Sequence, residues 1–114
     1  MKTFRKVAAA ALCLLASSFA CAGGTQTGTV NQLIVRASDG LIILWLNGTA
    51  SGRPACATIG YWMIKNENST AGKQQLAQLM MARALGIPVT VTGAGTCTRW
   101  SDGEDLDLVT IPGN

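Results

Sequence analysis

Apolar runs separated by short polar breaks dominate this chain, and the spacing within each run predicts one element of structure. Residues 30–36 and 41–46 are rich in β-branched and aliphatic side chains and flank a turn at Asp39 and Gly40. Two such runs around Asp-Gly predict a β-hairpin. The run at 41–46 is apolar at every position, which predicts cover on both of its faces and, in a chain this short, favours a second subunit.

The rest of the chain continues the same alternation. In chain order it predicts a loop at 47–54, a third strand at 55–65, a helix at 71–85, a fourth strand at 88–92, and a last strand at 106–111 that follows a segment at 96–103. The helix follows N-cap residues and ends at Gly86, with Pro88 two residues further on. Three strands, a helix and two strands is the element order of the OB-fold, a five-stranded Greek-key barrel. We therefore expect a mainly β domain with one helix, of the α+β class.

The predicted helix is amphipathic, but its apolar arc is wide. Its apolar half approaches about 180°, against the ~100° that contact with a single core requires, and Leu79 falls outside the stripe. An alanine-rich helix of a small core explains this arc, and so does a helix that also meets a partner. In the second interpretation the interface residues are Leu76, Leu79, Met80 and Arg83.

Residues 1–22 have the three parts of a secretory signal peptide: basic residues, an uncharged apolar run and small residues before a cleavage site. The apolar run of about 13 residues is shorter than the ~20 that cross a bilayer, so we expect no membrane span. Lipid attachment at Cys21 is less favoured, because Ser18 stands where lipoprotein signals carry an aliphatic residue. We expect cleavage near Ala22, a flexible lead at 23–29 and a single secreted or periplasmic domain at 30–114.

Cleavage after Ala22 removes Cys13 and Cys21 and leaves Cys56 and Cys97 as an even pair. In an oxidising compartment, two remaining cysteines are most simply explained by one disulfide bond. Catalytic and metal-binding roles for these cysteines are the less favoured alternatives.

Charge and composition exclude several classes of function. The formal charge of +3 comes from the leader, because residues 23–114 contain six basic and six acidic side chains. A neutral domain lacks the field that gathers phosphate backbones, so we expect no nucleic-acid partner. The chain contains no histidine, which excludes Ser-His-Asp triads, Cys-His pairs and histidine-ligated zinc, and we expect neither a metal nor a cofactor.

Two groups of residues could carry chemistry. Asp102, Glu104, Asp105 and Asp107 crowd together, and such carboxylates can hold calcium or cleave glycosides, although solvated charges at a barrel rim are the favoured interpretation. Among the aromatic residues, Trp100 is at a predicted loop tip and is the best candidate for stacking on a ligand. We expect the others to fill the core or a subunit interface. The candidate ligand-binding residues are Trp100, Arg99, Arg36, Ser38 and Asp39.

The sequence Arg-x-Ser-Asp-Gly occurs twice, at 36–40 and 99–103. Good turn residues explain both copies, and a pair of binding loops is the alternative.

Several short motifs resemble a known family. They are Arg53-Pro54-Ala55-Cys56-Ala57, Trp62, a helix with Leu76 and Ala84, Gly86-Ile87-Pro88-Val89-Thr90-Val91, and Thr96-Cys97. Between Ala55 and Cys97 the chain resembles the pentamer-forming B subunits of the subtilase-cytotoxin and pertussis-like toxin group. The resemblance implies a secreted OB-fold that binds cell-surface glycans, often sialylated. It also implies a homo-oligomer such as a pentamer, a helix around its central pore, a separate catalytic subunit and a disulfide between Cys56 and Cys97. The tight first hairpin and the apolar run at 41–46 depart from that family.

Together these observations favour a secreted, non-catalytic binding module that recognises a glycan or a protein surface. The alternatives are a periplasmic interaction or inhibitor domain, and an enzyme that uses the carboxylates between Asp102 and Asp107.

Overall fold

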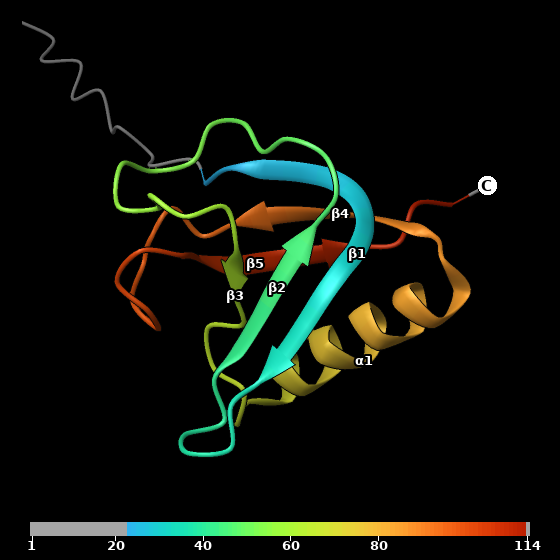
Figure 1. Cartoon of the computed structure of the whole chain (residues 1–114), viewed down its shortest axis with the longest axis horizontal. Helices are drawn as coiled ribbons and strands as arrows, with labels where there is room; N and C mark the ends of the chain where they lie inside the picture. The colour runs from blue at the N-terminus through green and yellow to red at the C-terminus, as the bar shows by residue number, and fades with distance from the viewer. Residues whose placement is uncertain (1–22, 114) are drawn as a thin grey trace, which may run out of the picture.

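Five strands close into a barrel with one helix at its end, as the computed structural model shows for residues 23–113 (Figure 1). The predicted signal peptide at 1–22 lies outside the described residues. The elements are β1 Thr25–Val35, β2 Ile42–Leu46, β3 Trp62–Met63, α1 Thr70–Leu85, β4 Pro88–Gly93 and β5 Glu104–Thr110. The strands pair in the order β1-β2-β3-β5-β4, β4 returns to β1, and only the β3–β5 pair is parallel. This arrangement confirms the prediction of an OB-fold-like, mainly β barrel with one helix.

The long strand β1 pairs with two neighbouring strands in turn. The predicted flexible lead at 23–29 is wrong, because Thr25–Thr29 is part of this strand. Thr25–Thr29 pairs with β4, and the part after Val30 pairs with β2. The polar Gln26 is only 5% exposed, because its amide nitrogen donates to the Gly48 carbonyl at 2.9 Å and its amide oxygen accepts from Trp62 Nε1 at 2.8 Å. A segment without apolar side chains can therefore enter the barrel when its polar groups are paired.

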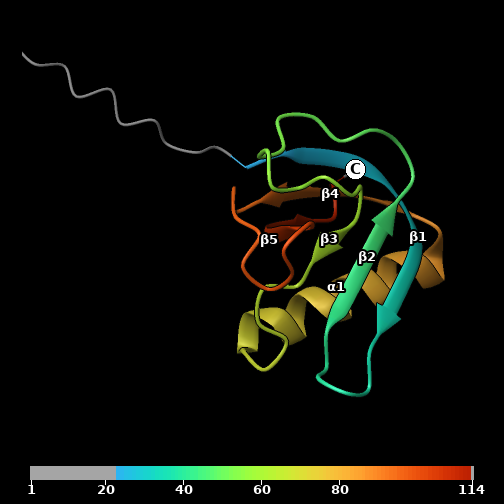
Figure 2. The same ribbon diagram turned by 60° about the vertical axis from the view of Figure 1, so that its left-hand side comes forward.

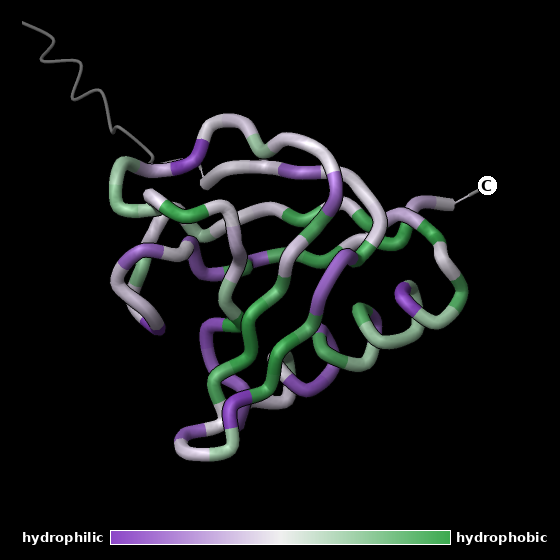
Figure 3. Tube along the Cα trace, viewed as in Figure 1, coloured by the Kyte–Doolittle hydropathy of each residue, from purple (hydrophilic) through white to green (hydrophobic). Residues whose placement is uncertain are grey.

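The predicted first hairpin is present. A turn between Arg36 and Leu41 joins β1 to β2, and Gly40 takes a φ of 76° that favours glycine. Along β2 the side chains alternate, so that every second residue is buried while Ile43 and Trp45 are half-buried on the outer face. In Figure 3 the parts of β1 and β2 that lie near this turn are both coloured as hydrophobic.

The predicted strand at 55–65 is wrong for most of its length, because only Trp62–Met63 pairs with neighbouring strands. The segment at 54–61 is a loop that Arg53 holds through side-chain hydrogen bonds to the carbonyls of Ile59 and Tyr61. The segment at 96–100, which precedes the last strand, is also a loop.

The helix forms where it was predicted. Ser69 caps it by accepting a hydrogen bond from Gly72 N at 2.9 Å, and Gly86 ends it in the left-handed conformation. The helix lies across one end of the barrel (Figure 2). Leu79 was one of the predicted interface residues, but this prediction is wrong, because Leu79 is fully buried in the core. Leu76 packs partly buried against the same core.

The other two predicted interface residues lie on the surface of the helix. Met80 is 57% exposed, and Arg83 is exposed, although its guanidinium donates to the carbonyls of Val30 and Asn31 in β1. Within residues 23–113, no helix combines the length and the apolar character that a membrane crossing needs.

Candidate binding face

Four of the five predicted ligand-binding residues form one cluster, which brings the two Arg-x-Ser-Asp-Gly segments together. Arg36 donates from Nε and Nη2 to both carboxylate oxygens of Asp39, at 2.8 and 2.6 Å. Arg99 donates to the Glu67 carboxylate at 2.8 and 3.0 Å and to the Asp39 carbonyl at 3.2 Å. The guanidinium of Arg36 lies over the Trp100 ring at 4.6 Å. We call Arg36, Asp39, Glu67, Arg99 and Trp100 the loop cluster.

The loop cluster combines an exposed ring with charges that cancel. Trp100 is 38% exposed, and Ser38, the fifth predicted residue, is exposed on the neighbouring hairpin tip. The hydrogen bond from Arg36 holds the pKa of Asp39 well below its usual range, and the hydrogen bond from Arg99 lowers the pKa of Glu67. Because folding lowers both pKa values, the two ionised carboxylates stabilise the folded protein fully above about pH 4. This stabilisation is lost as the pH falls through the lowered pKa values.

A row of three aromatic side chains extends from the loop cluster along the outer face of β2 and β3. The rings of Tyr61 and Trp45 meet edge to face, with 5.4 Å between their centroids. The Tyr61 hydroxyl donates to Asp102, two residues after Trp100. The pKa of Tyr61 is raised, first by burial and then by the Asp102 carboxylate. A hydrogen bond from the Trp100 side chain acts in the opposite direction but does not cancel this rise. We call Trp100, Tyr61 and Trp45 the aromatic row.

A cavity of about 340 Å³ opens beside the Trp45 end of this row, between β2 and the loop at 47–61. Its lining includes Gln26, Trp45, Thr49, Arg53, Thr58 and Gly60. Trp45 and Tyr61 were predicted to fill the core or a subunit interface, and the sequence did not predict this cavity. In the structure Trp45 lies on the outer face together with Ile43, two residues earlier. Because the run at 41–46 is apolar at every position, the sequence contains no alternation that would show this.

Arg53 lines the cavity and organises the loop, with only 11% of its side chain exposed. Its Nη1 and Nη2 donate to the carbonyls of Ile59 and Tyr61, at 2.8 and 2.6 Å, and its guanidinium stacks over Trp62 at 4.3 Å. Its Nε faces Glu104 Oε1 at 3.5 Å. Burial lowers the pKa of Arg53, and the Glu104 charge acts in the opposite direction.

Glu104 and Asp105 were predicted to be solvated charges at the barrel rim, and this prediction is wrong, because both are fully buried. Glu104 accepts hydrogen bonds from the main-chain nitrogens of Gly24 and Gly95, at 2.9 and 3.0 Å. Main-chain donors from distant segments therefore replace the water that a carboxylate at a rim would have. In contrast, Asp107 is exposed.

Asp105 shapes the loop that carries Arg99 and Trp100. Its carboxylate accepts from the hydroxyls of Thr96 and Thr98, at 2.7 and 2.6 Å, and from the main-chain nitrogens of Thr98 and Arg99, at 2.9 and 3.0 Å. Burial alone would raise the pKa of Asp105, but the hydrogen bonds from Thr98 and Thr96 outweigh it and the pKa is lowered. No group of three or more potential metal ligands lies together in the described part of the chain.

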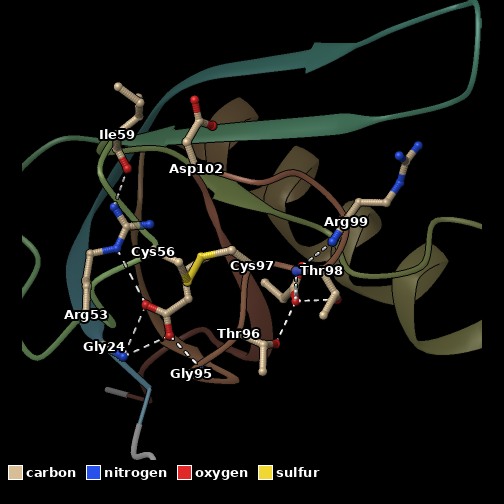
Figure 4. The surroundings of a disulfide bond; sticks show 12 residues. Gly24, Arg53, Cys56, Ile59, Gly95, Thr96, Cys97, Thr98, Arg99 and Asp102 are labelled. Atoms are coloured by element: carbon tan, nitrogen blue, oxygen red, sulfur yellow. Dashed lines mark hydrogen bonds and ion pairs between the residues drawn. A yellow bond between two sulfur atoms is a disulfide. The ribbon is translucent and has the colours of Figure 1, made fainter.

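The predicted disulfide between Cys56 and Cys97 is present, with 6.2 Å between the two Cα atoms. It joins the loop that follows Arg53 to the loop that precedes Arg99, as Figure 4 shows. One covalent bond therefore connects the wall of the cavity to the loop that carries Trp100. A disulfide is compatible with an extracellular or periplasmic location.

Comparisons with protein-family models, with curated proteins and with solved structures found no match for this chain. The resemblance to toxin B subunits therefore stays a prediction from the sequence.

Proposed function

We propose that this protein is a non-catalytic binding module that recognises a glycan through the aromatic row. The observation that carries the proposal is the place of this row, on the β2–β3 face between the loops at 36–41 and 94–103. OB-folds bind oligonucleotides and oligosaccharides with this face and these two loops. The balanced charge of the loop cluster favours a saccharide, because a nucleic acid needs a surplus of cations.

The ion pairs of the loop cluster support the proposal, because they hold the two loops of this face in one conformation before a ligand binds. Ion pairs from Arg36 and Arg99 tie the two loops to each other and to Glu67 at the start of the helix. A ligand that docks on loops already held in place loses less binding energy to ordering them. Arg36 covers part of the Trp100 ring, and the exposed part can stack on a sugar.

The contacts of the carboxylates support a role without catalysis. Glu104 and Asp105 accept main-chain hydrogen bonds inside the barrel, and the Asp102 carboxylate binds the Tyr61 hydroxyl. A pair that acts on a glycosidic bond must instead face the substrate from opposite sides. We therefore prefer a binding module to the carboxylate-dependent enzyme.

Trp100→Ala tests the proposed glycan site. We expect it to weaken glycan binding by about tenfold or more, because a stacked aromatic residue at the centre of a contact is typically worth that much. Binding to a glycan array followed by titration calorimetry measures the change. Leu108→Ala is the matched control, because it truncates another exposed apolar side chain, in β5. Equal binding by the two variants, or no binding of the unaltered protein to any glycan, would contradict the proposal.

We also propose that the protein self-associates through the outer surface of α1. This surface exposes Met80, Met81 and Leu85, and Leu85 is 66% exposed. Light scattering should give a mass that is a multiple of the single exported chain. Changing Met80 and Leu85 together to Glu should reduce it to one chain, because charges do not pack into an apolar contact. Thr110→Glu adds a charge at an exposed position of β5, away from the helix, and should leave the mass unchanged. A single-chain mass for the unaltered protein would contradict this proposal.

The resemblance to toxin B subunits implies a separate catalytic subunit, and a protein surface remains the alternative ligand. Both stay predictions.

A further inference from the structure

We infer that the cavity beside Trp45 binds an uncharged sugar, such as a neutral hexose or an N-acetylhexosamine, and not an acidic one. The inference rests on the proposed function and names the ligand class of the same face. It differs from the expectation of a sialylated ligand that the resemblance implies.

The shape of the cavity suits a sugar ring. Its volume of about 340 Å³ is at the small end of the range for ligand pockets, which suits one or two pyranose rings. The half-buried Trp45 indole forms one wall, and Tyr61 supports the ring from its edge. Gly60 lies next to the indole, where an added Cβ would come within 3.3 Å of Trp45 Cζ3. The absence of a side chain at Gly60 therefore leaves room beside the aromatic wall.

The charged groups around the cavity leave no free cation that could pair with the carboxylate of an acidic sugar. Arg53 is the one cationic side chain among its lining residues, and all three of its nitrogens face groups of the protein. Two donate to the carbonyls of Ile59 and Tyr61. The third, Nε, is buried, makes no hydrogen bond and lies 3.5 Å from the Glu104 carboxylate, so it is closed to a ligand. An acidic sugar would therefore lose water around its carboxylate and gain no counter-charge, which is unfavourable.

The same neutrality holds at the other end of the aromatic row. Arg36 pairs with Asp39, and Arg99 pairs with Glu67 and also approaches Asp39 at 3.5 Å. An acidic sugar stacked on Trp100 would meet guanidinium groups that are already balanced by carboxylates. Neither end of the row offers a cation without a partner in the described part of the chain.

The polar groups that remain at the cavity suit hydroxyl groups of a sugar. Thr49 and Thr58 are exposed at its rim, and each hydroxyl can both donate and accept a hydrogen bond. Gln26 forms part of the floor, but its amide is used within the barrel. An aromatic wall with uncharged hydroxyls around it matches a sugar that has apolar C–H faces and polar edges.

The decisive experiment uses pairs of oligosaccharides that differ only in a terminal sialic acid. We would array lactose, N-acetyllactosamine and diacetylchitobiose with and without that sialic acid, and titrate the best neutral binder while recording the indole N–H resonances. We expect the neutral members to bind, the Trp45 indole resonance to shift, and sialylation to give no gain in affinity.

Variants assign the sugar to the cavity. Trp45→Ala should weaken binding of the neutral saccharide by more than about tenfold. Thr58→Val removes one hydroxyl with little change of shape and should weaken binding about two- to tenfold. It keeps the test valid if Trp45→Ala does not fold. Thr110→Val is the matched control, because Thr110 is exposed on β5, away from the cavity lining.

The outcomes separate this inference from the proposed function. Tight binding of the sialylated members alone would overturn the inference and leave a glycan-binding module. Neutral binding that Trp45→Ala and Thr58→Val leave unchanged would overturn the assignment to this cavity. No binding of any glycan at millimolar concentration would overturn the proposed function and the inference with it.

Discussion

Replacing Glu104 by alanine should lower the free energy of unfolding by about 3–5 kcal/mol, a large share of the ~5–15 kcal/mol of a typical small domain. The carboxylate is fully buried, and its removal leaves the nearly buried Arg53 guanidinium without a counter-charge. The main-chain nitrogens of Gly24 and Gly95 lose their acceptor at the same time. An uncompensated buried charge costs more than the original pair contributes, which sets the size of the effect.

Urea unfolding followed by tryptophan fluorescence measures this loss. Asp107→Ala removes an exposed carboxylate from the same strand and should change the stability by no more than about 0.5 kcal/mol. Glu104→Gln keeps the shape and one acceptor but removes the charge, so its loss should lie between those of the other two variants. If Glu104→Ala were as mild as Asp107→Ala, the buried pair would not be the organising contact described here.

The surroundings of Glu104 also explain why glycines gather at this side of the barrel. A Cβ added at Gly93 would lie 1.8 Å from Glu104 Oε2, and one added at Gly24 would lie 2.5 Å from Arg53 Cγ. Neither approach is possible for a larger residue without displacing the buried charges. The sequence analysis placed Gly24 in a flexible lead, whereas in the structure Gly24 and Gly93 leave room for the buried ion pair.

Elements that depend on neighbouring residues were predictable from the sequence. The first hairpin follows from two apolar runs around Asp39 and Gly40, and the helix follows from its apolar spacing and its end at Gly86. The element order then limits the barrel to few topologies. The start of β1 was not predictable in this way, because its partners in β4 lie 59 to 67 positions away and its buried Gln26 is paired only in the folded chain.

The third strand shows a second limit of local patterns. The apolar residues between Cys56 and Ile64 suggest a full strand. Instead, carbonyls of the segment at 54–61 accept hydrogen bonds from the Arg53 side chain, and Cys56 ties the segment to Cys97, so that it pairs with no neighbouring strand. Ladder pairing and side-chain bonding compete for the same carbonyls, and the sequence does not show which of them prevails. The cavity beside Trp45 exists because this segment is a loop.

The candidate site was predictable in part. Loop-tip position and turn chemistry singled out Arg36, Asp39, Arg99 and Trp100, and the structure places these four together. That they bind a ligand stays a prediction. Their partner Glu67 was not singled out, because its contact with Arg99 joins residues 32 positions apart. The burial of Glu104 was missed for a similar reason, since its donor Gly24 lies 80 positions away. The donors of Asp105 lie only six to nine positions before it, but they meet its carboxylate only when the loop folds back.

Reducing the disulfide between Cys56 and Cys97 should lower the free energy of unfolding by about 4 kcal/mol, because the bond restricts the unfolded chain over a separation of 41 residues. Urea unfolding of the protein with and without a thiol reductant measures the difference. The same protein with both cysteines changed to serine should unfold at the lower stability and should not respond to the reductant. A reductant effect of equal size in that variant would show that the disulfide is not its cause.

Reduction should also weaken glycan binding under conditions where the protein remains folded. The disulfide joins the wall of the cavity to the loop that carries Trp100, so its loss frees both parts of the proposed face at once. A ligand must then order these loops when it binds, which lowers affinity without removing a contact. Calorimetry on the folded, reduced protein separates this effect from unfolding. Unchanged affinity in the reduced protein would mean that Arg53 and Asp105 hold the two loops in place without the disulfide.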